Sequence, residues 1–209
     1  MSPFYSGVKQ HIRAQAGITL MIHKKIQNTI ADYTFWNERI IQIRLKISRG
    51  YLTVIEIYTP IEGEEDESTK FYNKLQQTSN KINKNDFIMI MGDFNAGIGK
   101  TKIEQNIGLF GEETCNRNGS YLIDFVLYNQ LKVMNSFFDH KDSHKFTWEA
   151  RSLKSIIDYG ICNYKLAELV LDTRVFQGPE IEHDHHLLIF PVRMRPKWYK
   201  RKQNPMHNK

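Results

Sequence analysis

Hydrophobic residues along this chain occur mostly in short alternating or continuous runs, which is the pattern of β-strands rather than of helices. Residues 39–47 alternate apolar and polar side chains, residues 48–50 form a turn, and residues 51–58 form a second run, so we predict a β-hairpin. Residues 87–91 are all apolar, which predicts a strand that is buried on both faces. Further strands are predicted at residues 18–22, 131–135, 146–148, 155–161, 170–176 and 187–192.

Two segments have apolar residues at helical spacing. The first follows an acidic run at residues 62–67, which complements the dipole of a helix N-terminus, and has Phe71 and Leu75 on its inner side. The second starts at Asn118, which we expect to cap it. Strands outnumber helices and include both hairpins and helix-linked pairs. This order favours an α/β fold of two stacked mixed β-sheets flanked by helices, a four-layer sandwich, over a purely parallel doubly wound sheet.

Length and composition indicate one ordinary globular domain. The chain has 209 residues, enough for its own core, of which 41% are hydrophobic and 25% charged. No apolar run approaches the ~20 residues of a membrane span, and residues 1–13 lack the apolar region of a secretory signal. We therefore expect a nuclear or cytoplasmic protein that is neither secreted nor bound to a membrane. Cys115 and Cys162 lack disulfide or zinc spacing and are expected to be free thiols.

The net charge of +6 belongs to the C-terminal end of the chain. Residues 193–209 carry seven lysines and arginines and no acid, and the other residues carry 22 basic and 23 acidic side chains. We therefore divide the chain into a domain at residues 1–193 and a basic tail at residues 194–209. A solvated, disordered tail and a tail that touches phosphates without sequence preference are both consistent with this composition.

Polar side chains with chemical potential lie at the ends of predicted strands. Asp93 and Asn95 follow the apolar run, and Asp158 interrupts the strand at residues 155–161. A carboxylate in an apolar strand is costly unless it is hydrogen-bonded, so Asp158 either faces solvent from an edge strand or binds a histidine. The cluster at residues 183–186, which contains Asp184 and His185, is that partner, a surface loop or a zinc site. The carboxylate and carboxamide oxygens favour Mg²⁺ over a soft metal.

These residue types suit phosphodiester cleavage, which needs a base for water, positive charge and donors to the phosphate oxygens. Tyr58 is a further candidate because it ends a strand just before Thr59 and Pro60. A half-buried aromatic residue with no chemical role is the alternative for Tyr58.

The motifs YTP, GDFN, TW, IDY and DHH-L, in this order, resemble the endonuclease/exonuclease/phosphatase superfamily. That superfamily includes apurinic/apyrimidinic endonucleases, the deoxyribonuclease I group, sphingomyelinases and inositol polyphosphate phosphatases. The stretches RAQAGITLMIHKK and FFDHKDSHKFTW are most similar to the endonuclease domains of non-LTR retrotransposons and to craniofacial development protein 2-like sequences. The resemblance extends from about residue 5 to about residue 193.

The resemblance implies a role for each of five catalytic candidates. Tyr58 would contact the scissile phosphate. Asp93 would orient or deprotonate the attacking water, and Asn95 would stabilise the phosphate beside it. Asp158 would hold His185, which contacts the phosphate or acts as a base.

The resemblance also implies binding roles. Asp184 would help to bind the divalent cation, Mg²⁺ or Mn²⁺. Trp148 would line the nucleic-acid groove, or else pack as a core aromatic residue. Asn118 would approach the phosphate.

Departures from the superfamily pattern affect the expected activity. The superfamily opens with a strand that bears an asparagine and a second strand that ends in a metal-binding glutamate, and no glutamate precedes Gly17 here. We therefore expect an N-terminally truncated domain that lacks the first strands. His183 stands where serine is usual, and Ile156 where arginine or glutamine is usual.

The sequence thus predicts a divalent-metal-dependent, retrotransposon-derived endonuclease that acts on DNA, with its activity in question. One alternative is an inactive fold remnant or a nucleic-acid-binding module, and another is a phosphatase or phospholipase of the same superfamily. We expect a monomer without an obligate protein partner.

Overall fold

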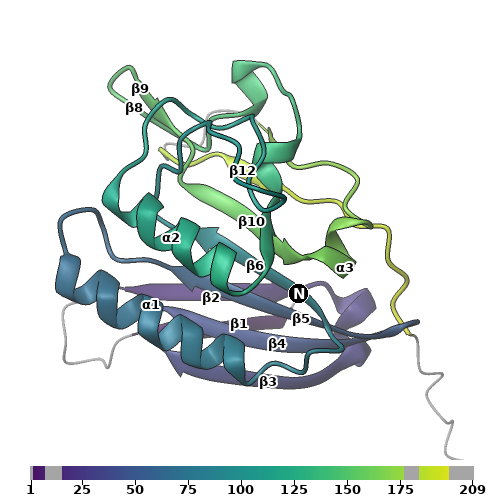
Figure 1. The fold of residues 1–209 in the computed structure, drawn as a ribbon. Coiled ribbons are helices and arrows are strands. Elements are labelled where there is room, and N and C mark those ends of the chain that lie inside the picture. Colours follow the sequence, from purple (N-terminus) through teal and green to yellow (C-terminus); the bar gives the residue numbers. More distant parts are fainter. Residues whose placement is uncertain (1, 8–15, 177–183, 198–209) are drawn as a thin grey trace, which may run out of the picture.

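The computed structural model describes residues 2–7, 16–176 and 184–197, and Figure 1 shows the arrangement of their helices and strands. The strands are β1 (Ser2–Gly7), β2 (Gly17–Ile22), β3 (Ile30–Asn37), β4 (Ile40–Ile47), β5 (Gly50–Tyr58), β6 (Phe87–Asp93), β7 (Leu131–Val133), β8 (Trp148–Ala150), β9 (Leu153–Ser155), β10 (Asp158–Asn163), β11 (Arg174–Phe176) and β12 (Leu187–Ile189). The α-helices are α1 (Glu65–Asn80), α2 (Arg117–Tyr128) and α3 (Tyr164–Ala167), and 3₁₀ turns lie at Lys24–Thr29, Met134–Phe137 and Asp142–His144.

A mixed six-stranded sheet in the order β3-β4-β5-β6-β10-β7 is the centre of the fold. The predicted hairpin is confirmed as β4 and β5, which pair in full register and turn at Gly50, where φ is +116°. β5 and β6 run parallel because α1 connects them as a crossover helix, whereas β6 and β10 are antiparallel. The α/β class and the mixed sheet flanked by helices that the sequence predicted are therefore confirmed.

Helices α1 and α2 lie side by side on one face of this sheet, as Figure 1 shows. The core on this face contains Leu75 of α1 and Leu122 of α2 against Ile55 and Ile90 of the sheet, all four fully buried. Burying such side chains stabilises the fold by about 1.5–3 kcal/mol each, so these helices are held by packing rather than by helix propensity.

A second, smaller core covers the opposite face of the sheet. Leu20 and Ile22 of β2 pack there with Val54 and Met89, and Phe190 packs against this cluster from the chain that follows β12. The second layer consists of separate two-stranded ladders, among them β1–β2 and β11–β12, instead of one continuous sheet. β2 contributes its alternate residues Leu20 and Ile22 to this core, in keeping with its alternating burial pattern.

The strands predicted at residues 131–135, 146–148, 170–176 and 187–192 are shorter or shifted, and β1 and β3 were not predicted. Two further differences concern residues of the candidate site. Asn116, not Asn118, caps α2, because its side chain accepts a hydrogen bond from the backbone N–H of Gly119 at 2.7 Å. The strand predicted at residues 155–161 is divided into β9 and β10, so Asp158 begins a strand instead of interrupting one. Asp158 consequently lies at a sheet end, where a carboxylate can reach other groups.

The remaining predictions concern the thiols, the membrane and the tail. Cys115 and Cys162 are free thiols, as expected. None of the helices in the described parts of the chain is long and apolar enough to cross a membrane. Of the predicted basic tail, residues 194–197 lie against β4, where the N–H of Lys197 donates to the carbonyl of Lys46 at 3.3 Å. Residues 198–209 lie outside the described residues.

Candidate active site

Three polar side chains meet in one row at an end of the six-stranded sheet. Tyr58 ends β5, Asp93 ends β6 and Asp158 begins β10. Asp93 is the register partner of both other residues. Cross-strand partners project from the same face of a sheet, so the three side chains point into one space beyond the second core.

His185 contacts both carboxylates of this row. Its Nδ1 lies 3.0 Å from Oδ2 of Asp158, and its Nε2 lies 4.0 Å from Oδ2 of Asp93. The hydrogen bond to Asp158 is the main reason that the pKa of His185 is raised, and the charges of Asp158, Asp93 and Asp184 add to the effect against desolvation. Asp158 therefore favours a proton on Nδ1, which leaves Nε2 directed towards Asp93.

Asp93 is an unusual carboxyl group because it is largely buried beside another acid. Burial, followed by the charge of Asp158, raises the pKa of Asp93 to about 6, and the N–H of Asn95 and the charge of His185 oppose that rise. A carboxylate with a pKa near neutrality is suited to accept a proton from water and to release it again.

Asn95 shapes the turn that follows Asp93. Its φ of 45° lies in the left-handed region, which asparagine tolerates better than most residues. The backbone N–H of Asn95 donates to Oδ1 of Asp93 at 2.8 Å, and its side-chain amide donates to the carbonyl of Thr59 at 2.9 Å. Asn95 thus ties the ends of β5 and β6 together and fixes the carboxylate between them.

Trp148 holds Asp184 through its indole. The Nε1–H of Trp148 donates to Oδ2 of Asp184 at 2.9 Å, and Trp148 forms an antiparallel bridge with His185. Trp148 is half-buried, so it neither packs as a core residue nor stands free on the surface. In this structure its contact is with the segment that carries the histidine.

Asn118 lies behind the site. It is 2% exposed, and its side-chain amide donates to the carbonyls of Pro60 at 2.9 Å and Asn95 at 3.2 Å. Its Oδ1 accepts a hydrogen bond from Ser68 at 3.0 Å. With these bonds, the Asn118 side chain supports the Asn95 turn from within and does not point towards the space between Asp93 and His185.

Thr147, which the sequence analysis did not select, connects the start of β10, which carries Asp158, to residues 184–186, which carry His185. Its Oγ1 accepts hydrogen bonds from the backbone N–H groups of Ile157 and Asp158, both at 3.0 Å. Its carbonyl accepts the N–H of His186 at 2.7 Å, and the side chain is fully buried. The threonine of the TW motif was the only sequence signal for this residue.

Glu56 is a second residue that the sequence analysis did not select. It lies two positions before Tyr58 in β5 and therefore projects from the same face of the sheet. Burial and the nearby charge of Asp158 raise the pKa of Glu56 to about 8. The one signal in the sequence was a charged residue on the inward side of a strand.

Arg39 places a positive charge beside Tyr58. Its Nη1 donates to the backbone carbonyl of Tyr58 at 3.3 Å, and its guanidinium carbon lies 5.3 Å from the centroid of the tyrosine ring. This arrangement is a cation–π contact, which orients the ring and brings a cation to the end of β5.

The described residues do not form a complete metal site. Among them, no group of three or more histidine, cysteine, aspartate or glutamate side chains is arranged to hold a metal ion. Asp184 is bound to Trp148, and His183 lies outside the described residues. We therefore assign no ligand to the Mg²⁺ or Mn²⁺ that the resemblance implies, and we derive no chemical step through a metal.

Comparisons with known proteins identify the family and the fold of the chain. The sequence profile of the endonuclease-reverse transcriptase family matches residues 52–189, which include most of the residues described above. Craniofacial development protein 2 of Tragulus javanicus is 32% identical over 197 residues, which make up 93% of this chain and 34% of that protein. The chain thus spans about a third of the length of this curated relative.

Two solved structures are similar in fold. The endonuclease domain of TRAS1, a telomere-specific non-LTR retrotransposon, superposes with a TM-score of 0.65 at 16% identity and covers 92% of this chain and 78% of that domain. An AP endonuclease from Archaeoglobus fulgidus gives a TM-score of 0.64 at 14% identity, with 91% of this chain and 79% of that chain covered. At these identities the likeness demonstrates a shared fold and not a shared activity.

Proposed function

The chain belongs to the endonuclease-reverse transcriptase family of the endonuclease/exonuclease/phosphatase superfamily, and we propose that it is a phosphodiesterase domain of endonuclease type that acts on DNA. The observation that supports this proposal best is the position of His185, whose ring nitrogens face Asp158 at 3.0 Å and Asp93 at 4.0 Å. The Nε2–H of the ring, as a donor, and the carboxylate of Asp93, as an acceptor, therefore lie within reach of a single phosphate group and the water that attacks it.

His185 and Asp93 have different roles in the proposed hydrolysis. Asp158 stabilises the protonated form of His185, so that Nε2–H donates to a non-bridging phosphate oxygen. Asp93, with its pKa of about 6, is ionised at neutral pH and accepts the proton of the attacking water. Such a base contributes roughly 10²–10⁴-fold to a rate.

Tyr58 and Arg39 complete the side of the site formed by β5. The guanidinium of Arg39 brings positive charge to Tyr58, and phosphate oxygens attract arginine strongly. Asn95 uses one of its two amide protons on Thr59 and keeps the other for the phosphate. These donors would neutralise charge that develops on the phosphate oxygens as the bond breaks.

The proposal also includes a requirement for Mg²⁺ or Mn²⁺, a DNA substrate, a monomeric state and a nuclear or cytoplasmic location. A family relationship supports the cation requirement, and no ligand set among the described residues does. The match to the endonuclease-reverse transcriptase family supports a nucleic-acid substrate, for which we propose DNA.

The experiment is a nicking assay on supercoiled plasmid with and without abasic sites, in Mg²⁺, Mn²⁺ or EDTA. We expect nicking by the wild type in the presence of a cation, and a loss of at least about 100-fold in Asp93→Ala and His185→Ala. His140→Ala is the matched control, because His140 forms a similar pair with Asp172 at 2.8 Å outside the site.

Equal nicking by the wild type and His185→Ala would overturn the proposed site. No nicking by the wild type at any cation concentration, with DNA binding intact, would replace the enzyme with a nucleic-acid-binding module. Cleavage of phosphomonoesters or phospholipids but not of DNA would favour the other branches of the superfamily.

A further inference from the structure

Residues 192–197 form a short segment that crosses the sheet at the end opposite to the candidate active site. Three backbone hydrogen bonds hold it: the N–H of Arg193 donates to Leu169 at 2.8 Å, the N–H of Ser48 donates to Arg195 at 2.9 Å, and the N–H of Lys197 donates to Lys46 at 3.3 Å. The segment is therefore fixed to the end of α3 on one side and to the β4–β5 turn on the other.

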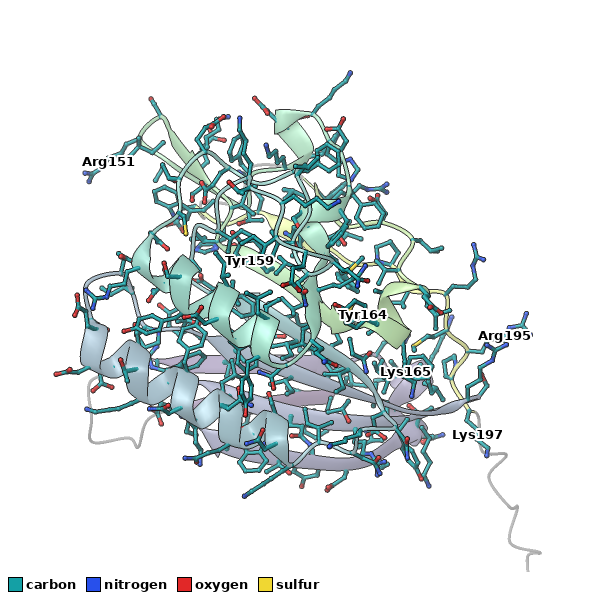
Figure 2. All side chains as sticks on the ribbon, viewed as in Figure 1. Arg151, Tyr159, Tyr164, Lys165, Arg195 and Lys197 are labelled. Carbon is teal, nitrogen blue, oxygen red and sulfur yellow. The ribbon has the colours of Figure 1, made fainter. Side chains whose placement is uncertain are left out.

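Side chains along this segment alternate between the protein and solvent. Val192 and Met194 pack against the second core, whereas Arg193, Arg195 and Lys197 are exposed. In Figure 2, the labelled Arg195 and Lys197 project outward from the segment at the edge of the molecule. Alternate residues of an extended chain lie about 6.6–7 Å apart, so the segment presents a regular row of positive charges.

Beside this row the surface is hollowed. The hollow has a volume of about 580 Å³, and its lining includes Arg49, Phe87, Leu169, Arg193 and Arg195. Three of these residues are arginines and none is acidic. Within the described residues, none of the three guanidinium groups forms an ion pair with a carboxylate.

The hollow and the candidate active site lie at opposite ends of the same strand. Phe87, which lines the hollow, begins β6, and Asp93 ends it. Seven residues of a strand extend over about 20 Å, so a ligand that reaches both places must be long. Arginine binds phosphate with two parallel hydrogen bonds, which makes a phosphate-bearing polymer a better match than a chain of single carboxylates.

We propose that this arginine hollow, formed around Arg49, Arg193 and Arg195, binds the phosphodiester backbone of a nucleic acid away from the site of cleavage. The inference rests on the nucleic-acid substrate proposed above and extends it, because it assigns a second contact about 20 Å from the chemistry. It predicts that the protein holds long substrates better than short ones.

The test compares two triple variants with equal charge changes. Arg49→Gln/Arg193→Gln/Arg195→Gln removes the guanidinium groups of the hollow. Lys70→Gln/Lys74→Gln/Lys81→Gln removes three charges from α1 and the residue after it, on the helix-covered face of the sheet. Fluorescence anisotropy in EDTA measures binding of single-stranded and duplex DNA of about 30 nucleotides and about 6 nucleotides. Arg49→Lys/Arg193→Lys/Arg195→Lys keeps the charge and removes the fork geometry.

We expect the arginine-to-glutamine variant to bind the long DNA at least about 10-fold more weakly than the wild type does. Its affinity for the short DNA, which cannot gain from two contacts at once, should fall less, so that the ratio of long-DNA to short-DNA affinity decreases. The magnitude of the slope of log K against log salt should fall by about 2 for single-stranded DNA and by about 2.7 for duplex DNA, as expected for three lost phosphate contacts. The Lys70/Lys74/Lys81 control should change the affinity for long DNA and the salt slope by less than this. The arginine-to-lysine variant should bind long DNA with an affinity between those of the wild type and the arginine-to-glutamine variant.

Equal losses in the two glutamine variants would overturn the hollow as a site, because general charge would then account for binding. Displacement of DNA by poly-glutamate of equal charge and at equal concentration would overturn the nucleic-acid assignment in favour of an acidic protein partner. These outcomes are independent of the nicking assay, since binding in EDTA does not require cleavage. A chain that binds long DNA through the hollow but never nicks it would leave the hollow standing and refute the proposed hydrolysis.

Discussion

Asp93 and Asp158 are direct partners across two antiparallel strands, and the imidazole of His185 lies against both. The two aspartates do not behave alike. Asp158 is bonded to Nδ1 of the histidine, whereas Asp93 is 4.0 Å from Nε2 and has a pKa raised to about 6. The pair therefore separates one carboxylate that holds a cationic ring from another that is able to exchange protons near neutral pH.

This separation predicts the pH dependence of cleavage. The rate should rise with pH through about 6 as Asp93 becomes ionised, and fall again once the pH passes the raised pKa of His185. Asp93→Asn should lower kcat by about 100-fold or more and abolish the rise on the acidic side. The measurement is a pH–rate profile on a fluorescent oligonucleotide, and an unchanged acidic limb in the variant would remove Asp93 as the base.

The Asp158–His185 hydrogen bond should be visible in the titration of the ring. Because this bond is the main cause of the raised pKa, Asp158→Asn should shift the pKa of His185 back towards its ordinary value of about 6.5. NMR titration of the imidazole measures the shift. The stabilisation by protonated His185 is fully present below the pKa of the unfolded chain and is lost as the pH rises through the folded value. The stability of Asp158→Asn should not decline across that window as the wild type does.

Glu56, like His185, should make the protein less stable as the pH rises, but over a different pH range. In the unfolded chain Glu56 ionises near pH 4.3, whereas the folded protein retains its proton to about pH 8, so stability falls as the pH rises between these values. Glu56→Gln should melt several degrees above the wild type at about pH 9 and differ little at about pH 4. A melting difference that does not depend on pH would show that Glu56 is ionised in the folded protein.

Thr147 should affect the site through geometry. Thr147→Val keeps the shape of the side chain and the main-chain hydrogen bonds of residue 147 with Ser155 and His186. It removes Oγ1, which accepts the N–H groups of Ile157 and Asp158. We expect kcat to fall roughly 10-fold and the pKa of His185 to drop, with recovery of both in Thr147→Ser. Thr78→Val is the control, because Thr78 is equally buried and its hydroxyl donates to the carbonyl of Lys74 within α1, away from the site. Similar losses of activity in both valine variants would indicate general destabilisation.

Gly92 precedes Asp93 and allows β5 and β6 to approach closely. Its φ is +136°, and a Cβ atom there would lie 2.0 Å from the carbonyl oxygen of Ile57. Gly92→Ala should destabilise the protein by about 2–4 kcal/mol and displace Asp93. Gly63→Ala is the matched control, since Gly63 also has a positive φ of +95° but no atom within 4 Å. Urea denaturation measures the two changes, and equal values would show that strain in φ, not the contact with Ile57, sets the cost.

Local patterns in the sequence predicted much of the fold. The hairpin at residues 39–58 has alternating side chains and a glycine turn, so its register follows from short-range information. The family resemblance is confirmed by the profile match, and it selected residues that the structure places together, such as Asp93, Asp158 and His185. Their roles remain predictions until the variants are assayed.

Features that depend on distant contacts were not predicted. β3 has mostly polar or exposed residues and forms a strand because β4 offers it an edge. Asn116 and Asn118 are two residues apart with equal capping propensity, and the buried bonds of Asn118 decide which of them caps α2. Thr147 and Glu56 acquire their importance from groups that only the folded chain brings near.

Residues 184–186, which carry His185, are held at the site by few main-chain hydrogen bonds among the described residues. Within the described part of the chain, and beyond their side-chain contacts, residues 184–186 join Thr147 and β8 through two main-chain hydrogen bonds: the N–H of His186 donates to Thr147, and the N–H of Glu149 donates to Asp184. Segments held by few bonds open at a lower free-energy cost than the sheet and helices around them. The His185 ring should therefore lose its contacts with Asp158 and Asp93 in dilute urea, while the circular dichroism of the whole protein is still that of the native state. The candidate site would then come apart at a lower urea concentration than the sheet and helices that support it.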